Sequence, residues 1–396
     1  MGSLEKGGLE SQYRTLAETL KEDYGYSTNM VGKWHLGWCN ETYLPNSRGF
    51  DEFRGIWHAG TDHYTYLDNG KDAYDLHSGT GADYTYNGQY STDAYAAYAE
   101  TLINAHDAND PLFMYVATNT IHTPWQVDTS YKRQYRSYGL SNSRKTASAM
   151  VTATDDLVGS IQASLESKGM WDNTVFIFVS DNGGLATGGA SNWPLRGAKE
   201  TYFEGGMRVP AFMYSPLFDG HITPNTDNQC MFHISDFFPT IVGLLGGTTS
   251  GLDGIDQWES IIDGGSGCQR TNMVHDITLK WDGSIKTGFY RDGNYKLMIG
   301  DAGTNSGWYH PDDQEDQELG DAYDESLEYL FDVSGDDYEV TNLRYDDAYA
   351  SIVADMTAAI NSYASSIVDF ELSGTCSTDD CINSANEWYT GCCNWS

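Results

Sequence analysis

The sequence predicts an α/β protein in which a mainly parallel sheet lies between helices, followed by a smaller α+β subdomain. Short apolar runs alternate with helix-like segments along the first 264 residues, and these runs lack polar alternation. Such runs are typical of strands buried on both faces of a parallel sheet. After Gly264, short strand-like pieces stand between acidic and Gly-rich loops. We therefore expect a first domain over residues 1–264 and an α+β subdomain with a Cys-rich tail over residues 265–396.

The individual elements follow from local patterns. Apolar residues recur at helical spacing over residues 13–24, and Gly25 stands where a C-terminal cap belongs. The same reasoning predicts further helices over residues 150–165, 234–245 and 352–367. Strands are expected over residues 27–31, 112–117, 175–179, 209–214, 285–290, 295–299 and 327–333.

The charge balance limits the possible partners. The chain has 22 Lys and Arg against 57 Asp and Glu, a formal net charge of −35. This balance excludes a basic nucleic-acid footprint as a global feature. It also repels polyanions at long range, so an anionic substrate needs a local cluster of cations. The alternative is a surface adapted to salty surroundings, where screening shortens that repulsion.

The cysteines point to an oxidising compartment. There are seven, and four of them crowd into the last 21 residues: Cys376, Cys381, Cys392 and Cys393. This pattern predicts disulfides with one Cys left over, in a secreted or lysosomal (lumenal) glycoprotein with N-x-[ST] sequons at Asn40 and Asn394. No run of 18 apolar residues exists, so we expect no membrane span. The first twelve residues contain no apolar signal core.

Polar side chains follow the expected strands where ligands bind in open parallel sheets. They are Lys33 and His35, His122, the pair Asp181 and Asn182, and Lys199. Carboxylate and amide oxygens suit a hard cation, and Lys and His donors suit the oxygens of a tetrahedral anion. Each of these motifs also has an interpretation that involves no function. Asp-Asn-Gly-Gly is a common turn, a His beside Pro is often structural, and Lys-Trp-His fits a solvated surface.

Longer stretches around these residues resemble the sulfatase family, and within it the arylsulfatase B group. Residues 25–37 (GYSTNMVGKWHLG) look like the second sulfatase signature, and residues 192–206 (NWPLRGAKETYFEGG) resemble the corresponding arylsulfatase B loop. Similar segments follow in consistent order from about Leu16 to Leu343. The resemblance implies an alkaline-phosphatase-like fold and a sulfuric ester hydrolase that acts on sulfated sugars or aryl sulfates.

The resemblance also implies roles for single residues. Asp181 and Asn182 are expected to ligate Ca²⁺, and Lys33 and Lys199 to hold sulfate oxygens. His122 is expected to contact the sulfate and assist the leaving alcohol. His35 is expected to contact a formylglycine hydrate, the nucleophile of the family. These roles agree with what sulfate ester cleavage requires: a positioned nucleophile, charge neutralisation and a protonated leaving oxygen.

The nucleophile motif is not present in these 396 residues. The family forms formylglycine from the Cys of Cys-x-Pro-Ser-Arg, and no Cys here is followed four positions later by Arg. A paired Asp-Asp metal site is missing too. We expect a chain that lacks the first βα unit and is inactive as given. The alternatives are a catalytically inactive protein that binds sulfated glycans, and a phospho- or phosphonate-ester hydrolase with another nucleophile.

One aromatic stretch has two interpretations. Residues 57–66 (WHAGTDHYTY) either line the approach of a sugar, because aromatic faces stack on carbohydrate, or form a buried aromatic cluster.

Overall fold

The computed structural model describes residues 8–68, 73–220, 222–223, 225–265, 267–311, 324 and 328–367. The chain divides into two compact units. The first comprises the described residues up to Tyr138 together with Lys145–Asp172, and the second comprises Gly139–Arg144 and the described residues from Asn173 onward. The Cys-rich tail lies outside the described residues, and the domain boundary at residue 264 stays a prediction.

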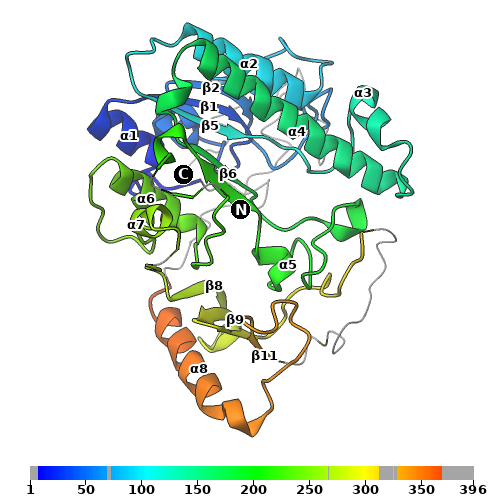
Figure 1. Ribbon diagram of the computed structural model, residues 1–396, viewed down its shortest axis with the longest axis vertical. Helices are drawn as coiled ribbons and strands as arrows, with labels where there is room; N and C mark the ends of the chain where they lie inside the picture. Colours follow the sequence, from blue (N-terminus) through cyan, green and yellow to red (C-terminus); the bar gives the residue numbers. More distant parts are fainter. Residues whose placement is uncertain are drawn as a thin grey trace. The chain divides into compact units, whose positions relative to one another are not determined.

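The first unit contains a five-stranded sheet in the order β4-β3-β2-β1-β5 (Figure 1). The central strand β1 (Ser27–Gly32) runs parallel to both β2 (Glu52–Ile56) and β5 (Leu112–Ala117). The short strands β3 (Leu76–Ser78) and β4 (Gly81–Ala82) are added antiparallel at the β2 side. The predicted α/β architecture is confirmed, with a mixed rather than purely parallel sheet.

Helices cover this sheet on both faces. Met30 of β1 packs with Ala17 of α1 (Leu16–Tyr24), whereas its neighbour Val31 packs with residues of α2 (Ser91–Ala105) and α4 (Asn142–Ser167). Successive residues of a strand point to opposite faces, so β1 is buried between the two clusters. Helix α1 begins at a Thr15 capping box and is followed by Gly25 in the left-handed conformation. The Gly25 cap is the one that the sequence predicts.

Short helical segments complete the first unit and its junction with the second. They are η1 (Glu41–Tyr43), η2 (Pro45–Arg48), α3 (Thr129–Lys132), η3 (Arg133–Tyr135) and η4 (Trp171–Asn173).

The second unit begins with two strands that differ from the prediction. We expected buried parallel strands over residues 175–179 and 209–214. Instead, β6 (Phe176–Val179) and β7 (Ala211–Tyr214) pair antiparallel in a sheet of their own, and β7 leaves Phe212 and Tyr214 half-exposed. β5 is likewise only partly buried, because it lies at the edge of its sheet. Apolar composition alone therefore did not predict burial on both faces in these strands.

Six helical segments lie between β6 and β8 in the described part of the second unit. They are η5 (Ala186–Gly188), α5 (Glu204–Met207), η6 (Pro216–Phe218), η7 (Ile234–Asp236), α6 (Phe237–Leu244) and α7 (Trp258–Ile262).

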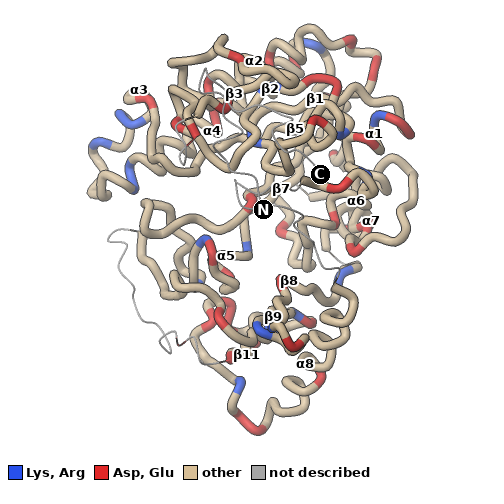
Figure 2. Tube along the Cα trace, turned by 180° about the vertical axis from the view of Figure 1, so that it is seen from behind, with Lys and Arg blue, Asp and Glu red and all other residues tan. Residues whose placement is uncertain are grey.

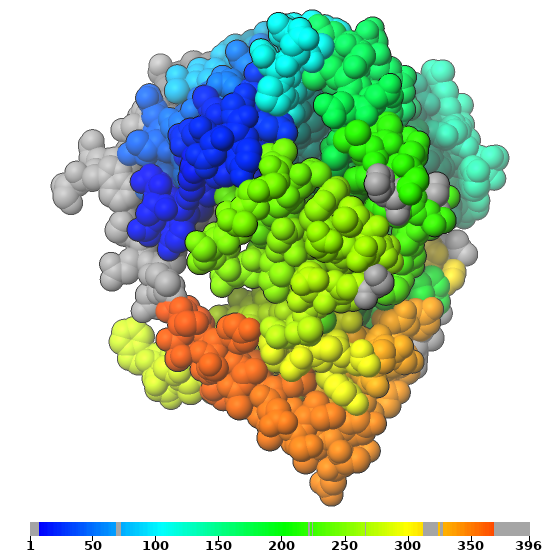
Figure 3. All heavy atoms as spheres, turned by 60° about the vertical axis from the view of Figure 1, so that its left-hand side comes forward, coloured from blue at the N-terminus to red at the C-terminus, as the bar shows by residue number. Residues whose placement is uncertain are grey.

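A four-stranded antiparallel sheet ends the described part of the second unit, in the order β11-β10-β9-β8. Its strands are β8 (Asn272–Leu279), β9 (Ile285–Asp292), β10 (Tyr295–Ile299) and β11 (Tyr329–Asp332). After η8 (Asp347–Tyr349), helix α8 (Ala350–Ala364) packs Val353, Met356 and Ile360 against these strands. The orange-red atoms in Figure 3 belong to this part of the chain. This antiparallel sheet with its helix has the α+β architecture that the sequence predicted.

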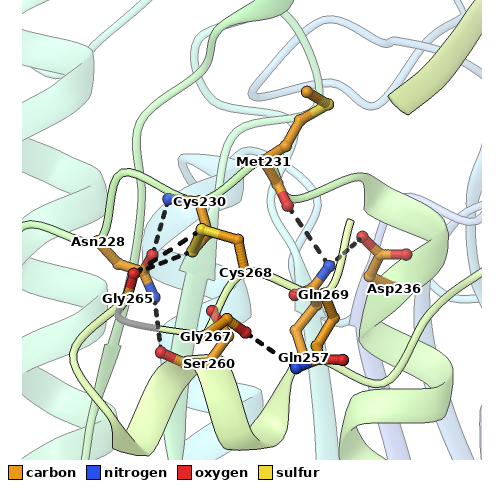
Figure 4. The surroundings of a disulfide bond; sticks show 10 residues. All are labelled: Asn228, Cys230, Met231, Asp236, Gln257, Ser260, Gly265, Gly267, Cys268 and Gln269. Carbon is orange, nitrogen blue, oxygen red and sulfur yellow. Dashed lines mark hydrogen bonds between the residues drawn. A yellow bond between two sulfur atoms is a disulfide. The ribbon is translucent and has the colours of Figure 1, made fainter. Parts of the chain in front are cut away.

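One disulfide lies in the second unit, between Cys230 and Cys268 (Figure 4). The two sulfur atoms lie 3.4 and 3.8 Å from the Gly265 carbonyl oxygen. Cys39 is buried, and the other four cysteines lie outside the described residues. Among the helices described, none has the length and apolar character required to cross a membrane.

Candidate active site

The turn that carries Lys33 and His35 leaves the carboxyl end of the central strand β1. Lys33 N–H donates to the Ala117 carbonyl at the end of β5 (2.7 Å), and His35 N–H donates to the Trp57 carbonyl just beyond β2 (3.0 Å). The turn is therefore joined to both neighbours of β1. This is the edge at which parallel sheets bind ligands, as the sequence predicted.

The backbone of this turn is specialised. Gly32 has φ +101°, and a Cβ there would lie 2.1 Å from the Ala117 carbonyl oxygen, so only glycine fits. His35 has φ +52°, a left-handed conformation that His adopts more readily than most side chains but that is still uncommon. Between them, Trp34 is buried and its indole donates to the Gly37 and Tyr43 carbonyls. The Lys-Trp-His segment is thus anchored by its Trp, which excludes a plainly solvated loop.

His122 lies on the loop that follows β5. Its N–H donates to the Asn119 carbonyl (2.9 Å), and its Nδ1 is 2.9 Å from the Thr123 carbonyl oxygen. A carbonyl only accepts, so Nδ1 carries the hydrogen in this contact. Nε2 is then the nitrogen at which His122 gains or loses a proton, as a residue that assists a leaving alcohol must do.

A second histidine, His63, contacts the backbone of this loop. It is fully buried, and its Nε2 lies 3.1 Å from the His122 backbone carbonyl while its Nδ1 lies 2.8 Å from Ser91 Oγ. Burial lowers the pKa of His63, which favours the neutral ring. The Nε2–H then donates to the carbonyl, and Nδ1 must accept the single hydroxyl hydrogen of Ser91.

This assignment fixes one more side chain. Ser91 Oγ also lies 3.1 Å from the Asn119 amide oxygen as placed, yet its hydrogen is already used. The buried Asn119 Nδ2 has no hydrogen-bond partner in that orientation. Turning the amide lets Nδ2 donate to Ser91 and removes the conflict at the hydroxyl, because amide oxygen and nitrogen are distinguished only by their network; the amide oxygen then takes the position that Nδ2 had. The result is a directed chain from Asn119 through Ser91 and His63 to the His122 carbonyl.

Gln126, in the loop that follows β5, forms two more hydrogen bonds to the segment that contains His63. Its Oε1 accepts from His63 N–H (2.9 Å), and its Nε2 donates to Asp62 Oδ2 (2.6 Å). Burial pushes the pKa of Asp62 upward, but the hydrogen bonds from Gln126, Thr65 and Tyr64 outweigh it and hold that pKa at about 2. Sequence reasoning missed the roles of His63, Gln126 and Asp62, since only a tertiary contact reveals them.

The stretch over residues 57–66 is largely core. Trp57, His58, His63 and Tyr66 are fully buried, and Tyr64 is half-buried. Trp57 stacks on His77 with ring centroids 3.5 Å apart. The interpretation that this stretch lines a sugar-binding approach is wrong, because these rings pack inward.

In the second unit, Asp181 and Asn182 lie just beyond the end of β6. Asp181 is exposed, and Asn182 is half-buried with its Nδ2 donating to the Gly183 carbonyl (2.8 Å). Gly183 N–H donates to the Gly206 carbonyl, and a Cβ on Gly183 would lie 1.9 Å from the Gly205 carbonyl oxygen. The Asp-Asn pair is therefore presented by a turn that is packed against the loop over residues 192–206.

That loop carries Lys199. Lys199 N–H donates to the Gly184 carbonyl (3.1 Å), and Asn192 bridges the same segments with its amide bonded to both the N–H and the carbonyl of Gly184. Gly184 is two residues from Asn182. The backbone thus brings Lys199 next to the Asp181-Asn182 turn.

A buried ion cluster anchors the far side of this loop. Lys296 Nζ of β10 lies 2.9 Å from Glu204 Oε1 and 2.8 Å from Glu339 Oε1, and Glu339 Oε2 accepts from Glu204 N–H. Burial raises the pKa of Glu339 to about 7. Burial also opposes ionisation of Glu204, but Lys296 outweighs it and lowers the pKa of that carboxyl. Nearby, Arg196 donates to the Ser306 and Glu339 carbonyls.

The described residues do not make a complete calcium cage. No cluster of three or more His, Cys, Asp or Glu side chains suited to a metal ion occurs among them. Asp181 and Asn182 offer at most three side-chain oxygens, whereas Ca²⁺ takes six to eight oxygen ligands. Ca²⁺ binding at this pair therefore needs ligands beyond those that the described residues gather.

The predicted site residues fall into two groups. Lys33, His35 and His122 lie in the first unit, and Asp181, Asn182 and Lys199 lie in the second. Within each group, the backbone contacts above bring the segments together. That all six serve one site stays a prediction.

Several known proteins similar to this chain are sulfatases. The Sulfatase family model matches residues 1–247. Arylsulfatase J of Mus musculus is 37% identical over 320 residues, covering 75% of this chain and 52% of that protein. N-acetylgalactosamine-6-sulfatase of Homo sapiens is 29% identical over 283 residues, covering 65% of this chain and 50% of that protein. The chain spans about half the length of these curated relatives.

The fold is that of solved sulfatase-like structures. The crystal structure of Ps i-CgsB in complex with k-i-k-neocarrahexaose matches with a TM-score of 0.74 at 23% identity, covering 92% of this chain and 77% of that chain. This likeness confirms the alkaline-phosphatase-like fold. Because the family model matches well over half of its residues, the chain belongs to the sulfatase family, whose members are sulfuric ester hydrolases.

Proposed function

We propose that this chain recognises the sulfate ester of a carbohydrate and takes part in its hydrolysis by arylsulfatase chemistry. The observation that carries the proposal is the Lys33–His35 turn. In a sulfatase-family chain, it is bonded to both strands beside β1 at the ligand-binding edge of the sheet. A sugar substrate is supported by the relative named for N-acetylgalactosamine 6-sulfate and by the neocarrahexaose complex. An arylsulfatase B-like preference is a finer proposal of the same kind.

The roles of the residues follow from their chemistry. Lys33 and Lys199 offset the charge on the sulfate oxygens, and His122 donates a proton from Nε2 to the departing sugar oxygen. His35 is proposed to contact the formylglycine hydrate, and Asp181 and Asn182 to contribute two ligands to Ca²⁺. The disulfide between Cys230 and Cys268 supports a secreted or lumenal location, because disulfides persist in oxidising compartments.

Binding tests this proposal directly. We expect N-acetylgalactosamine 6-sulfate to bind the purified chain in calorimetry, and unsulfated N-acetylgalactosamine to give no heat. Lys33→Ala and His122→Ala each remove a hydrogen bond to a charged group, so affinity should fall about 10- to 100-fold. Lys286→Ala, an exposed lysine of β9, is the matched control. No heat with the sulfated sugar would contradict the proposal.

A second candidate function is glycan binding without turnover. It is favoured by one observation: no Cys in the 396 residues is followed by Arg four positions later. This second candidate predicts no turnover of 4-nitrophenyl sulfate, with or without Ca²⁺, because the family's nucleophile is formed from that motif. Turnover that Lys199→Ala abolishes would reject this candidate and establish the chain as a hydrolase.

A further inference from the structure

A basic surface stands out against the acidic chain. No Asp or Glu occurs over residues 129–154, although the whole sequence has 57 in 396 residues, and this stretch holds five of the 22 Lys and Arg. Lys132, Arg133 and Arg136 belong to α3 and the turns after it, and Lys145 lies near the start of α4. Figure 2 shows the basic positions gathered around α3.

The two arginines form the outward part of this surface. Both are exposed, and they stand three residues apart across η3, where side chains at this spacing lie on the same side. Among the described residues, neither forms an ion pair within 4.0 Å. Arg133 interacts with Asp128, the N-cap of α3, whose pKa is lowered by a hydrogen bond from Ser130 and by the attraction of Arg133.

Two other side chains of this segment hold its backbone on α4. Lys132 Nζ donates to Thr146 Oγ1 of α4 (2.6 Å), and the Tyr135 hydroxyl bonds to Thr152 Oγ1 (2.8 Å). The short helical segment is thus held on α4 by two side chains. The backbone that carries the arginines is thus ordered before a ligand binds, and binding costs only the freedom of the arginine side chains.

Exposed aromatic rings lie beside the arginines. Tyr138 is 58% exposed, and its ring centroid lies 6.0 Å from that of Tyr135. Tyrosine faces stack on sugar rings, while guanidinium groups bind planar or tetrahedral oxyanions with two hydrogen bonds. The combination suits a chain of sugars that carries anionic groups.

Contacts connect this surface to the loop of His122. Tyr131 lies next to Tyr90, with ring centroids 6.4 Å apart, and Tyr90 lies 5.8 Å from His63. His63 in turn contacts the His122 carbonyl. The basic surface is therefore separated from the His122 loop by two ring contacts within the first unit.

We propose that the α3–η3 surface, made of Arg133, Arg136 and Tyr138, is a subsite for a sulfated polysaccharide. It would hold a sulfated unit other than the one whose ester lies at His122. In a chain with a net charge of −35, these cations supply the local attraction that a polyanionic substrate needs. The inference rests on the proposed function, because it identifies the substrate as a polymer with several sulfate groups.

The test compares a long and a short sulfated ligand on the same protein. The probes are a neocarrahexaose with several sulfates, its unsulfated hexasaccharide and N-acetylgalactosamine 6-sulfate. Exposed ion pairs are each worth up to about 1 kcal/mol, so R133Q/R136Q should weaken hexasaccharide binding about three- to tenfold. Its affinity for the monosaccharide should not change. K280Q/K286Q removes two exposed cations of the second unit as the matched control.

Two substitutions at Tyr138 test whether its ring contributes to binding. Tyr138→Ala should weaken hexasaccharide binding, and Tyr138→Phe should retain it, because stacking needs the ring and not the hydroxyl. All of these positions are exposed, so thermal unfolding should match that of the unchanged protein and confirm that each variant is folded.

The outcomes separate this inference from the proposed function. If R133Q/R136Q binds the hexasaccharide normally while Lys33→Ala weakens both sulfated probes, the subsite is rejected and the proposed function stands. If Lys33→Ala has no effect while R133Q/R136Q lowers hexasaccharide affinity, the basic surface stands and the proposed function fails. If a single-stranded hexanucleotide binds as tightly and loses as much affinity in R133Q/R136Q, the assignment to sulfated sugars is overturned.

Discussion

At the scale of single residues, the position of His122 depends on a histidine that lies beneath it. His63 is buried, neutral and bonded to the His122 carbonyl, and it acts as a positioning residue rather than as a catalytic one. Its own geometry is set by Ser91 and Asn119. Buried side chains therefore determine the conformation of the His122 loop.

Replacing His63 tests this dependence. His63→Ala leaves the His122 carbonyl and the Ser91 hydroxyl without this partner, so the free energy of unfolding should fall by about 1–3 kcal/mol and sulfate affinity should fall as well. His63→Gln retains a side-chain N–H donor and should restore affinity more than stability. Urea unfolding and calorimetry measure the two effects, with His106→Ala as a control outside this chain of bonds.

Two outcomes would count against a positioning role. One is an unchanged sulfate affinity in His63→Ala. The other is a loss of affinity that is equally large in His63→Gln and His63→Ala, since a donor at this position would then be irrelevant.

Residues differ in how well the sequence predicts them. Lys33, His35 and Lys199 could be selected because each follows a strand-like run and sits in a recognisable stretch. His63 could not be given its role, because the partners that define it, Ser91 and His122, are 28 and 59 positions away along the chain. A histidine in a loop shows no local pattern that separates a buried hydrogen-bond hub from a surface ligand.

At the scale of elements, the loop of Lys199 is fastened to β10 by the buried cluster of Lys296, Glu204 and Glu339. Lys296 is fully buried, and it neutralises carboxylates from two separate segments. Breaking such a cluster costs more than the cluster itself contributes, because the remaining charges stay buried without compensation.

We expect Lys296→Met to lower the free energy of unfolding by about 3–5 kcal/mol. Adding Glu204→Gln in the same chain should recover part of the loss, because one uncompensated carboxylate is removed. Chemical denaturation measures both steps. A single-variant loss below about 1 kcal/mol, the level of an exposed pair, would show that water reaches the cluster and compensates its charges.

The sequence predicted helices best where apolar residues fill one face, and strands best where they form one continuous run. Helices α1 and α8 and strands β1, β5 and β10 were expected close to their observed bounds, whereas α4 begins eight residues before the predicted range of 150–165. Strands β2 and β8 were missed, because both mix charged or polar residues into short runs. Helix α2 was missed too, since its Ala and Tyr residues form a weak apolar stripe. The antiparallel pairing of β6 and β7 depends on tertiary contacts, which no local pattern contains.

At the scale of the whole molecule, the charge of −35 makes stability depend on salt. Like charges repel one another in the folded state, and the Debye length falls from about 30 Å at 0.01 M to about 3 Å at 1 M. We expect Tm to rise when NaCl is increased from about 10 mM to 1 M at pH 7. Near the sequence pI of about 4.3 the rise should be much smaller, because the net charge is close to zero there.

Calorimetric scans at the two pH values check this. An equal salt effect at both would show that salt acts through hydration of the surface rather than through screening of the net charge.

The left-handed backbone of His35 has a consequence for how this residue should be studied. Alanine at φ +52° is strained, whereas Asn tolerates that region well. An alanine scan would therefore combine two effects at this position, the loss of an imidazole and the relaxation of the turn that also presents Lys33. Asn removes the imidazole while it retains the local backbone, so His35→Asn is the substitution that isolates the chemical role.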